Sequence, residues 1–212
     1  RPEIVQNYIS NTNDLILLED HKLNLNYRKN NLIVSGEGKI QLDEEMSKIE
    51  YLINKNKKNL DIKTELFINN IYLKKQDFIK IYFPQMGETI NFNNQKIKID
   101  YKNKNLSVSG SGKFKVHKDY DEINYFFEKK ENSMNFNTEL NLKNTIFKID
   151  SINYKKKDDT NMLLKISGEL KNNKNLIINN FTITENDNKI KINNLFLNNE
   201  KQVIKIDKID LN

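Results

Sequence analysis

The sequence contains no cysteine, no alanine and no tryptophan, and it has only six glycines, two prolines and two histidines. Without cysteine the chain has no disulfide, no thiolate metal ligand and no cysteine nucleophile. The longest purely apolar runs, such as Leu15 to Leu18, are far shorter than the roughly 18–20 residues of a membrane-spanning helix. No stretch of this sequence has the pattern of a signal peptide. The chain begins with Arg1 and Pro2 rather than Met, so we expect it to be a segment of a longer protein.

Branched and aromatic residues dominate the apolar set of the 212-residue chain, and such side chains favour β-strands. Lys and Arg number 35 against 29 Asp and Glu, a net charge of +6. The lysines are spread over every segment and interleaved with acids, without a dense basic block. This pattern is typical of a solvated face rather than of a phosphate-binding stripe. A polyanion-binding surface stays open as a weaker hypothesis, and it would show steep salt dependence.

An internal repeat at an offset of 74 residues is the strongest signal in the sequence. The segment NYRKNNLIVSGEGKI (26–40) aligns without a gap on DYKNKNLSVSGSGKF (100–114). The match extends in both directions, so residues 2–73 and 76–147 read as two copies of one unit. A diverged third copy, 148–212, includes Ile152-Asn153-Tyr154 and then Ile166-Ser167-Gly168 after a short insertion. We expect one continuous repeat-built segment.

Each copy is predicted to open with a short helix, Pro2–Ile9 or Asp77–Phe83, and to continue in four strands. Apolar residues recur at every second position in these strands, which predicts a sheet with one buried face. Helical interpretations of Glu44–Ile53 and Lys118–Lys129 stay open because both segments are charged. The predicted strands of the second copy and of the tail are Lys96–Tyr101, Leu106–Val116, Glu122–Glu128, Met134–Leu142, Leu176–Ile183, Lys189–Leu197 and Gln202–Leu211.

The motif Gly36-Glu37-Gly38-Lys39 and its copy from Gly110 to Lys113 lack the spacing of a phosphate-binding loop. Glycine inside an alternating strand more often marks a bulge or a close approach of backbones. The recurring Glu65 and Glu139 fall on the polar phase, where pairing with a cross-strand lysine explains them better than acid–base catalysis.

His21 and His117 have no neighbouring metal-ligand pattern, and we expect both to be solvent-exposed. Nothing in the sequence supports catalysis, a metal or a cofactor. The aromatic residues share the phase of Ile, Leu and Val, which argues against a base-stacking platform for nucleic acid.

A long sheet with one apolar face must cover that face. It either folds onto itself as a sandwich or curls into a trough whose lining an apolar ligand fills. The residues alone leave these two architectures equally open.

The strand Y-x-x-x-x-L-x-V-S-G-x-G-K-[IF], read from Tyr27 and from Tyr101, resembles the AsmA-like family, which includes AsmA, TamB and YhdP. The following I-x-Y and T-E-L strands and Phe83-Pro84 extend the resemblance, which is closest to the YhdP-type central region. The resemblance implies an elongated, taco-like antiparallel β-groove in the periplasm. It also implies an inner-membrane anchor in a missing N-terminal part and a role in phospholipid transfer and outer-membrane integrity.

We therefore expect an all-β segment that shields acyl chains of phospholipid or another lipid, not an enzyme, with no nucleic-acid partner. The alternative is a structural or adhesive repeat array with a closed core and no ligand. The residues expected to line the groove are Leu25, Tyr27, Leu32, Val34, Ile99, Tyr101, Leu106, Val108, Tyr125, Phe136, Leu140 and Ile166.

Overall fold

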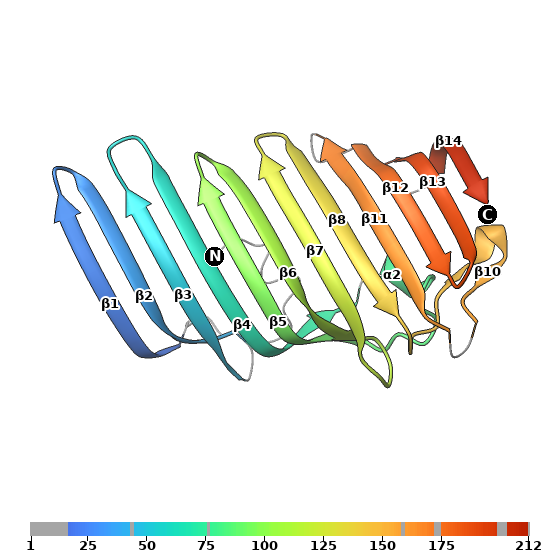
Figure 1. Ribbon diagram of the computed structural model, residues 1–212, viewed down its shortest axis with the longest axis horizontal. Coiled ribbons are helices and arrows are strands. Elements are labelled where there is room, and N and C mark those ends of the chain that lie inside the picture. The colour runs from blue at the N-terminus through green and yellow to red at the C-terminus, as the bar shows by residue number, and fades with distance from the viewer. Residues whose placement is uncertain are drawn as a thin grey trace.

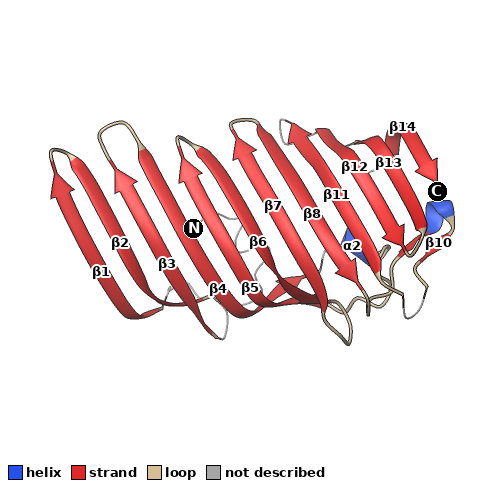
Figure 2. Cartoon of the chain, viewed as in Figure 1, coloured by secondary structure: helices blue, strands red, loops and turns tan. Residues whose placement is uncertain are grey.

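The computed structural model describes residues 17–42, 45–75, 77–157, 160–171, 175–198 and 203–211. Twelve strands in these ranges form one open antiparallel sheet, in which nearly every strand pairs with its neighbours in sequence (Figures 1 and 2). The sheet consists, in order, of β1 (Leu18–Arg28), β2 (Asn31–Gln41), β3 (Met46–Lys55), β4 (Leu60–Lys74), β5 (Thr89–Lys102), β6 (Asn105–Lys115), β7 (Asp121–Lys130), β8 (Ser133–Leu142), β11 (Met162–Lys171), β12 (Asn175–Glu185), β13 (Asn188–Leu197) and β14 (Val203–Leu211).

The predicted all-β class is confirmed, and so are the predicted strands of the second copy and the tail, which correspond to β5–β8 and β12–β14. Strands β3 and β7 occupy most of the two segments for which a helical interpretation stayed open. Their apolar residues alternate with charges at a period of two, so a strand segregates the two kinds of side chain and a helix would mix them.

The expected helix in each copy is not confirmed. Residues Asp77–Lys80 form α2, a single turn of four residues, and the chain leaves the helix before Pro84. A 3₁₀ turn, η1 (Asp150–Ile152), connects β9 (Lys148–Ile149) to β10 (Tyr154–Lys155) in a separate two-stranded hairpin. So short a helix has too few hydrogen bonds to outweigh its nucleation cost without packing. The predicted helix Pro2–Ile9 lies outside the described residues.

The strands end along two opposite edges of the sheet, and the connections between strands differ in length at these two edges (Figure 1). Short turns join strands along one side, and both central residues of Lys29-Asn30 and of Asn103-Lys104 have positive φ, as two-residue type I′ hairpins require. We call residues 28–30, 55–59, 102–104 and 129–132 the hairpin rim. The opposite side, the loop rim, carries the longer connections, which include 77–88 and 143–157.

Strands 74 residues apart in the first eight strands have matching positions. Strands β2 and β6 begin and end 74 residues apart, and β1 and β5 each carry a bulge at the corresponding place, between Glu19 and Lys22 and between Asn93 and Lys96. Segment Ile166-Ser167-Gly168 lies in β11, which pairs with β8 as β5 pairs with β4. Tyr154 lies in the small hairpin rather than in the large sheet.

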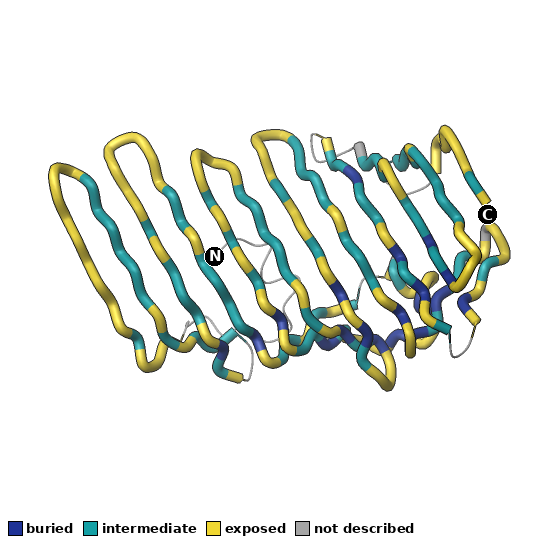
Figure 3. The backbone as a smooth tube through the Cα atoms, viewed as in Figure 1, coloured by how far each residue is buried: buried dark blue, intermediate teal, exposed yellow. Residues whose placement is uncertain are grey.

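The core is one-sided and lies against the loop rim. Connections 77–88 and 143–157 fold over the apolar face there, and buried residues gather near this rim in Figure 3. The buried core consists of Phe83, Met86, Phe114, Val116, Ile123, Leu142, Phe147, Met162, Leu164 and Ile183. Among the described residues there is no second large sheet, so they do not form the closed sandwich that the sequence left open.

Candidate apolar ligand surface

Cross-strand register puts the apolar phase of every strand on one face of the sheet. Residues directly opposite each other in an antiparallel pair have side chains on the same side. In the first half of the sheet, Val34 lies opposite Ile53, Ile53 opposite Ile62, and Ile62 opposite Tyr101. The same relation continues through the second half, so a single apolar face runs across all twelve strands. Its pairs there include Tyr101–Leu106, Val108–Phe127, Phe127–Phe136, Thr138–Ile166, Ile166–Phe181, Phe181–Ile192 and Ile192–Ile209.

All twelve residues expected to line a groove lie on this face. Leu25 and Tyr27 of β1 are the most open, with exposed fractions of 63% and 62%. The other ten are half-buried. Leu23 and Phe127 also lie on this face, and their period-two alternation is visible in the sequence. Leu195 lies there too, but it is out of phase with Ile192, so alternation alone does not identify it.

Aromatic rings lie over glycines at two matching places on the face. A Cβ added to Gly36 would meet the Tyr51 ring at 2.5 Å, and one added to Gly110 would meet the Tyr125 ring at 2.2 Å. The glycines therefore leave room for the rings, a close approach of side chain to backbone rather than a phosphate loop. Burial raises the pKa of Tyr125 to about 12, which indicates weak hydration of this part of the face.

Gly38 and Gly112 have a related role beside the two bulges. Gly38 makes room for the His21 ring, and Gly112 makes room for the Gln95 side chain. His21 is half-buried and stacks on Tyr51 with ring centroids 6.1 Å apart. The expectation of a solvent-exposed His21 is therefore wrong, because the bulge turns its side chain toward Gly38; His117 is exposed as expected.

Near the loop rim the apolar face is covered by aromatic residues of the connections. Phe83 and Phe147 meet edge to face at 5.3 Å, and the backbone N–H of Lys148 donates to the Tyr82 carbonyl at 3.0 Å. Leu142 and Met162 beneath this cover have no exposed surface. This covered half of the face is an ordinary hydrophobic core.

Two buried carboxylates hold the covering connections in place. Asp121 accepts hydrogen bonds from the backbone N–H groups of Lys143, Asn144 and Thr145 at 2.8–2.9 Å. Glu185 accepts hydrogen bonds from three donors, which lie in β10 and in the segment that follows it. These donors are the Tyr154 hydroxyl at 3.0 Å, the Lys157 backbone N–H at 2.8 Å and the Thr160 hydroxyl at 2.5 Å. Both carboxylates are fully satisfied structural groups rather than free acids or bases.

Toward the hairpin rim the apolar face has no such cover among the described residues. Side chains there are half-buried or exposed in β1 through β8, although they are as apolar as those of the core. Leu25 of β1 and Phe127 of β7, with 37% of its surface exposed, belong to this strip. We call the part of the apolar face on β1 through β8 that lies between the hairpin rim and the buried core the uncovered half of the apolar face.

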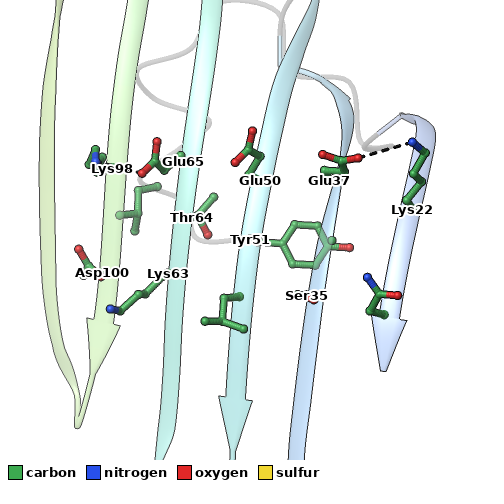
Figure 4. A pocket seen from close by; sticks show the side chains of 14 residues that line it. Lys22, Ser35, Glu37, Glu50, Tyr51, Lys63, Thr64, Glu65, Lys98 and Asp100 are labelled. Atoms are coloured by element: carbon green, nitrogen blue, oxygen red, sulfur yellow. Dashed lines mark ion pairs between the residues drawn. The ribbon is translucent and has the colours of Figure 1, made fainter. Parts of the chain in front are cut away.

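The opposite face is polar and contains an open depression of about 590 Å³ over β1–β5. Glu37, Glu50 and Glu65 lie side by side on neighbouring strands in this depression (Figure 4). Like charges in direct opposition repel, but each carboxylate has its own lysine. The ion pairs are Lys22–Glu37 at 3.6 Å, Lys48–Glu50 at 2.6 Å and Lys98–Glu65 at 3.0 Å.

The predicted pairing of the recurring carboxylates with cross-strand lysines is confirmed. Glu65 pairs with Lys98 across β4 and β5, and Glu139 pairs with Lys165 at 2.7 Å across β8 and β11. The hydrogen bond from Lys98 lowers the pKa of Glu65, so this side chain is a carboxylate at neutral pH. A pair already neutralised in this way is a poor general base.

Within the described ranges, no group of three or more His, Asp or Glu side chains has the geometry to hold a metal ion. None of their helices has the length and apolarity to cross a membrane. Comparison of the chain with protein-family models, with curated proteins and with solved structures gives no match. The candidate functional site is therefore the uncovered half of the apolar face.

Proposed function

We propose that this chain is a segment of a lipid-transfer conduit and that the uncovered half of its apolar face shields the acyl chains of phospholipids. The observation that carries the proposal is the continuity of this strip over neighbouring strands without a covering layer among the described residues. Contiguous exposed apolar surface on this scale marks an interaction site. Each Å² that an acyl chain removes from water contributes about 25 cal/mol.

The middle of the uncovered half contains no charge, so its contact with chains is nonspecific. Leu106 and Val108 of β6, for example, have Tyr101, Ile99 and Phe127 among their neighbours on the same face. Such a surface accepts chains of different length and unsaturation, because dispersion and burial do not depend on precise chemistry.

The repeat and the curvature of the sheet are part of the same proposal. A repeat-built sheet that curls into a taco-like groove extends the apolar face along the strand order, and the matching positions of β2 and β6 support such a repeat. Periplasmic location, an inner-membrane anchor and a role in outer-membrane integrity complete the hypothesis that the AsmA-like resemblance suggests.

The second candidate is a structural or adhesive array with a closed core. It requires a layer that covers the whole apolar face. The connections provide this layer over the covered half only, so the described residues favour the lipid hypothesis.

The decisive experiment is lipid extraction and native mass spectrometry of the purified protein, with Val108→Asp as the variant. The wild type is expected to carry phospholipid, and Val108→Asp should lose it because the new carboxylate lies among acyl chains. Ser109→Asp is the matched control, since Ser109 lies on the same strand but on the polar face, opposite Phe126 and Lys98. It should keep its lipid.

Circular dichroism separates loss of binding from loss of folding. If Val108→Asp does not fold, Leu25→Asp replaces it, because Leu25 is already 63% exposed and contributes less to the core. A folded Asp variant that retains lipid would contradict the assignment of the site. A wild type that folds cooperatively and carries no lipid would favour the structural array.

A further inference from the structure

The hairpin rim concentrates the positive charge of the molecule. It contains nine cations and one acid, Glu131, whereas the whole chain has 35 cations and 29 acids. The net positive charge of the rim alone is therefore larger than the +6 of the whole chain, and the remaining residues together carry a small net negative charge. The nine cations are Arg28, Lys29, Lys55, Lys57, Lys58, Lys102, Lys104, Lys129 and Lys130.

These cations are close in space although they are distant in sequence. The four turns lie along one side of the sheet (Figure 1), and neighbouring strands are about 4.8 Å apart. Consecutive turns are thus about 10 Å apart, comparable to the Debye length at physiological ionic strength. Their fields overlap, and the rim acts as a continuous positive line rather than as separate charges.

Most of the rim cations have no ion-pair partner among the described residues. Several lysines of the polar face do pair with carboxylates, as Lys98 does with Glu65. The loop rim mixes both signs, and Lys148 pairs there with Asp150 at 2.8 Å. Of the nine rim cations, only Lys130 has an ion-pair partner among the described residues, Glu128.

Two of the nine, Lys55 and Lys129, lie on the apolar face itself. Lys55 is opposite Leu32 and Leu60 on its two neighbouring strands. Lys129, 74 residues later, is opposite Leu106 and Met134. A lysine in this setting places its methylene stem along apolar surface and its ammonium group at the water boundary. Strands β3 and β7 therefore each have a lysine at the edge of the uncovered half that adjoins the hairpin rim.

The uncovered half has a suitable depth below these lysines. Leu106 to Gly112 on β6 spans about 20 Å at 3.3 Å per residue, and the buried core begins at Phe114. The hydrocarbon of one bilayer leaflet is about 15 Å deep, half of the core of a bilayer. An acyl chain fits between the lysines and the core with its polar end at the hairpin rim.

We propose, on the basis of the lipid-transfer function above, that the hairpin rim is the phosphate-binding side of the groove. Lys55 and Lys129 bind the phosphate groups of phospholipids whose acyl chains lie on the uncovered half, and the other rim cations supply the surrounding positive field. The ligand class is thus a phosphate-bearing diacyl lipid, and phosphate supplies charge-assisted acceptors that a neutral head group lacks.

The test compares two lipids with identical acyl chains, phosphatidic acid and diacylglycerol, by native mass spectrometry of the protein with an equimolar mixture. The wild type should bind phosphatidic acid about tenfold more than diacylglycerol, the size expected for charge-assisted hydrogen bonds. The double variant Lys55→Gln, Lys129→Gln should bring this ratio close to one while diacylglycerol binding persists. The control Lys113→Gln, Lys189→Gln removes the same charge from outside the hairpin rim and should leave the ratio unchanged.

An unchanged ratio in the folded double variant would overturn the phosphate assignment and leave the acyl-binding function intact. Binding of neither lipid by the wild type would instead refute the proposed function itself. Displacement of phosphatidic acid by an equal concentration of inorganic phosphate would identify a free-anion site and contradict the proposal. A double variant that keeps its ratio but no longer sediments with phosphatidylglycerol vesicles would assign the rim to membrane-surface contact instead.

Discussion

The covered and uncovered halves of the apolar face are made of the same residue types on the same strands. Phe114 and Leu106 both belong to β6 and to one phase, yet Phe114 is 4% exposed and Leu106 is half-buried. The difference comes from the connections at the loop rim, whose aromatic residues cover one half only. Packing that stabilises the fold is therefore concentrated near the loop rim, and the more accessible part of the apolar face lies near the hairpin rim. The same alternation of apolar and polar residues thus provides both the packed core and the accessible apolar surface.

The largest effect expected from this comparison is on the free energy of unfolding. Leu164→Ala in the covered half should lower it by about 2–5 kcal/mol, because the cavity is surrounded by packed side chains. Leu106→Ala removes the same atoms from the uncovered half and should cost clearly less, because water already reaches the site. Urea denaturation of both variants measures the difference. Equal losses would mean that the two halves do not differ in packing.

A smaller effect is expected where a ring lies over a glycine. Gly110→Ala should destabilise the protein by about 1–3 kcal/mol, because the added methyl group overlaps the Tyr125 ring and forces it to move. Gly87→Ala is the control, since nothing lies within 4 Å of its added Cβ, and its effect should stay within about 0.5 kcal/mol. The midpoint of thermal unfolding reports both. A tolerated Gly110→Ala would show that the Tyr125 ring has room to leave the glycine.

The smallest effect concerns the pH dependence of the cover. Burial raises the pKa of Glu185, but hydrogen bonds from Thr160, Lys157 and Tyr154, with the nearby Lys156, lower it further, so the net pKa lies below its usual 4.5. A carboxyl group with a lowered folded-state pKa contributes stability above pH 4.5, and this contribution is lost as the pH falls through the folded-state pKa. Glu185→Gln keeps a hydrogen-bond acceptor but does not titrate. The free energy of unfolding of this variant should therefore fall less steeply as the pH is lowered, which means a flatter acid limb of the stability curve.

Urea denaturation of the wild type and of Glu185→Gln between pH 3 and pH 7 measures the acid limb. Its control is Glu139→Gln, which removes a half-buried carboxylate on the polar face, where it pairs with Lys165. An acid limb as steep in Glu185→Gln as in the wild type would exclude Glu185 as its source.

Period-two alternation was enough to predict the strands, their pairing as a meander and the common face of the twelve candidate residues, because strand geometry fixes side-chain direction locally. The helix expected over Asp77–Phe83 is shorter than predicted, since the segment before Pro84 forms one turn only. His21 was misjudged because a bulge, invisible in the pattern, decides which way its ring points. How much of the face is covered was not predictable, because it depends on where the connections fold.

An all-β chain with one apolar face follows from the order of the amino acids alone, since alternation is a property of neighbouring residues. The different character of the two rims, in contrast, arises only when the chain folds. In the sequence the lysines are interleaved with acids and form no basic block. The meander then brings every second turn to the same side, so that Lys29, Lys57, Lys104 and Lys129 form one line of charge. Charges separated by tens of residues interact only after folding places them about 10 Å apart, within reach of one another's fields.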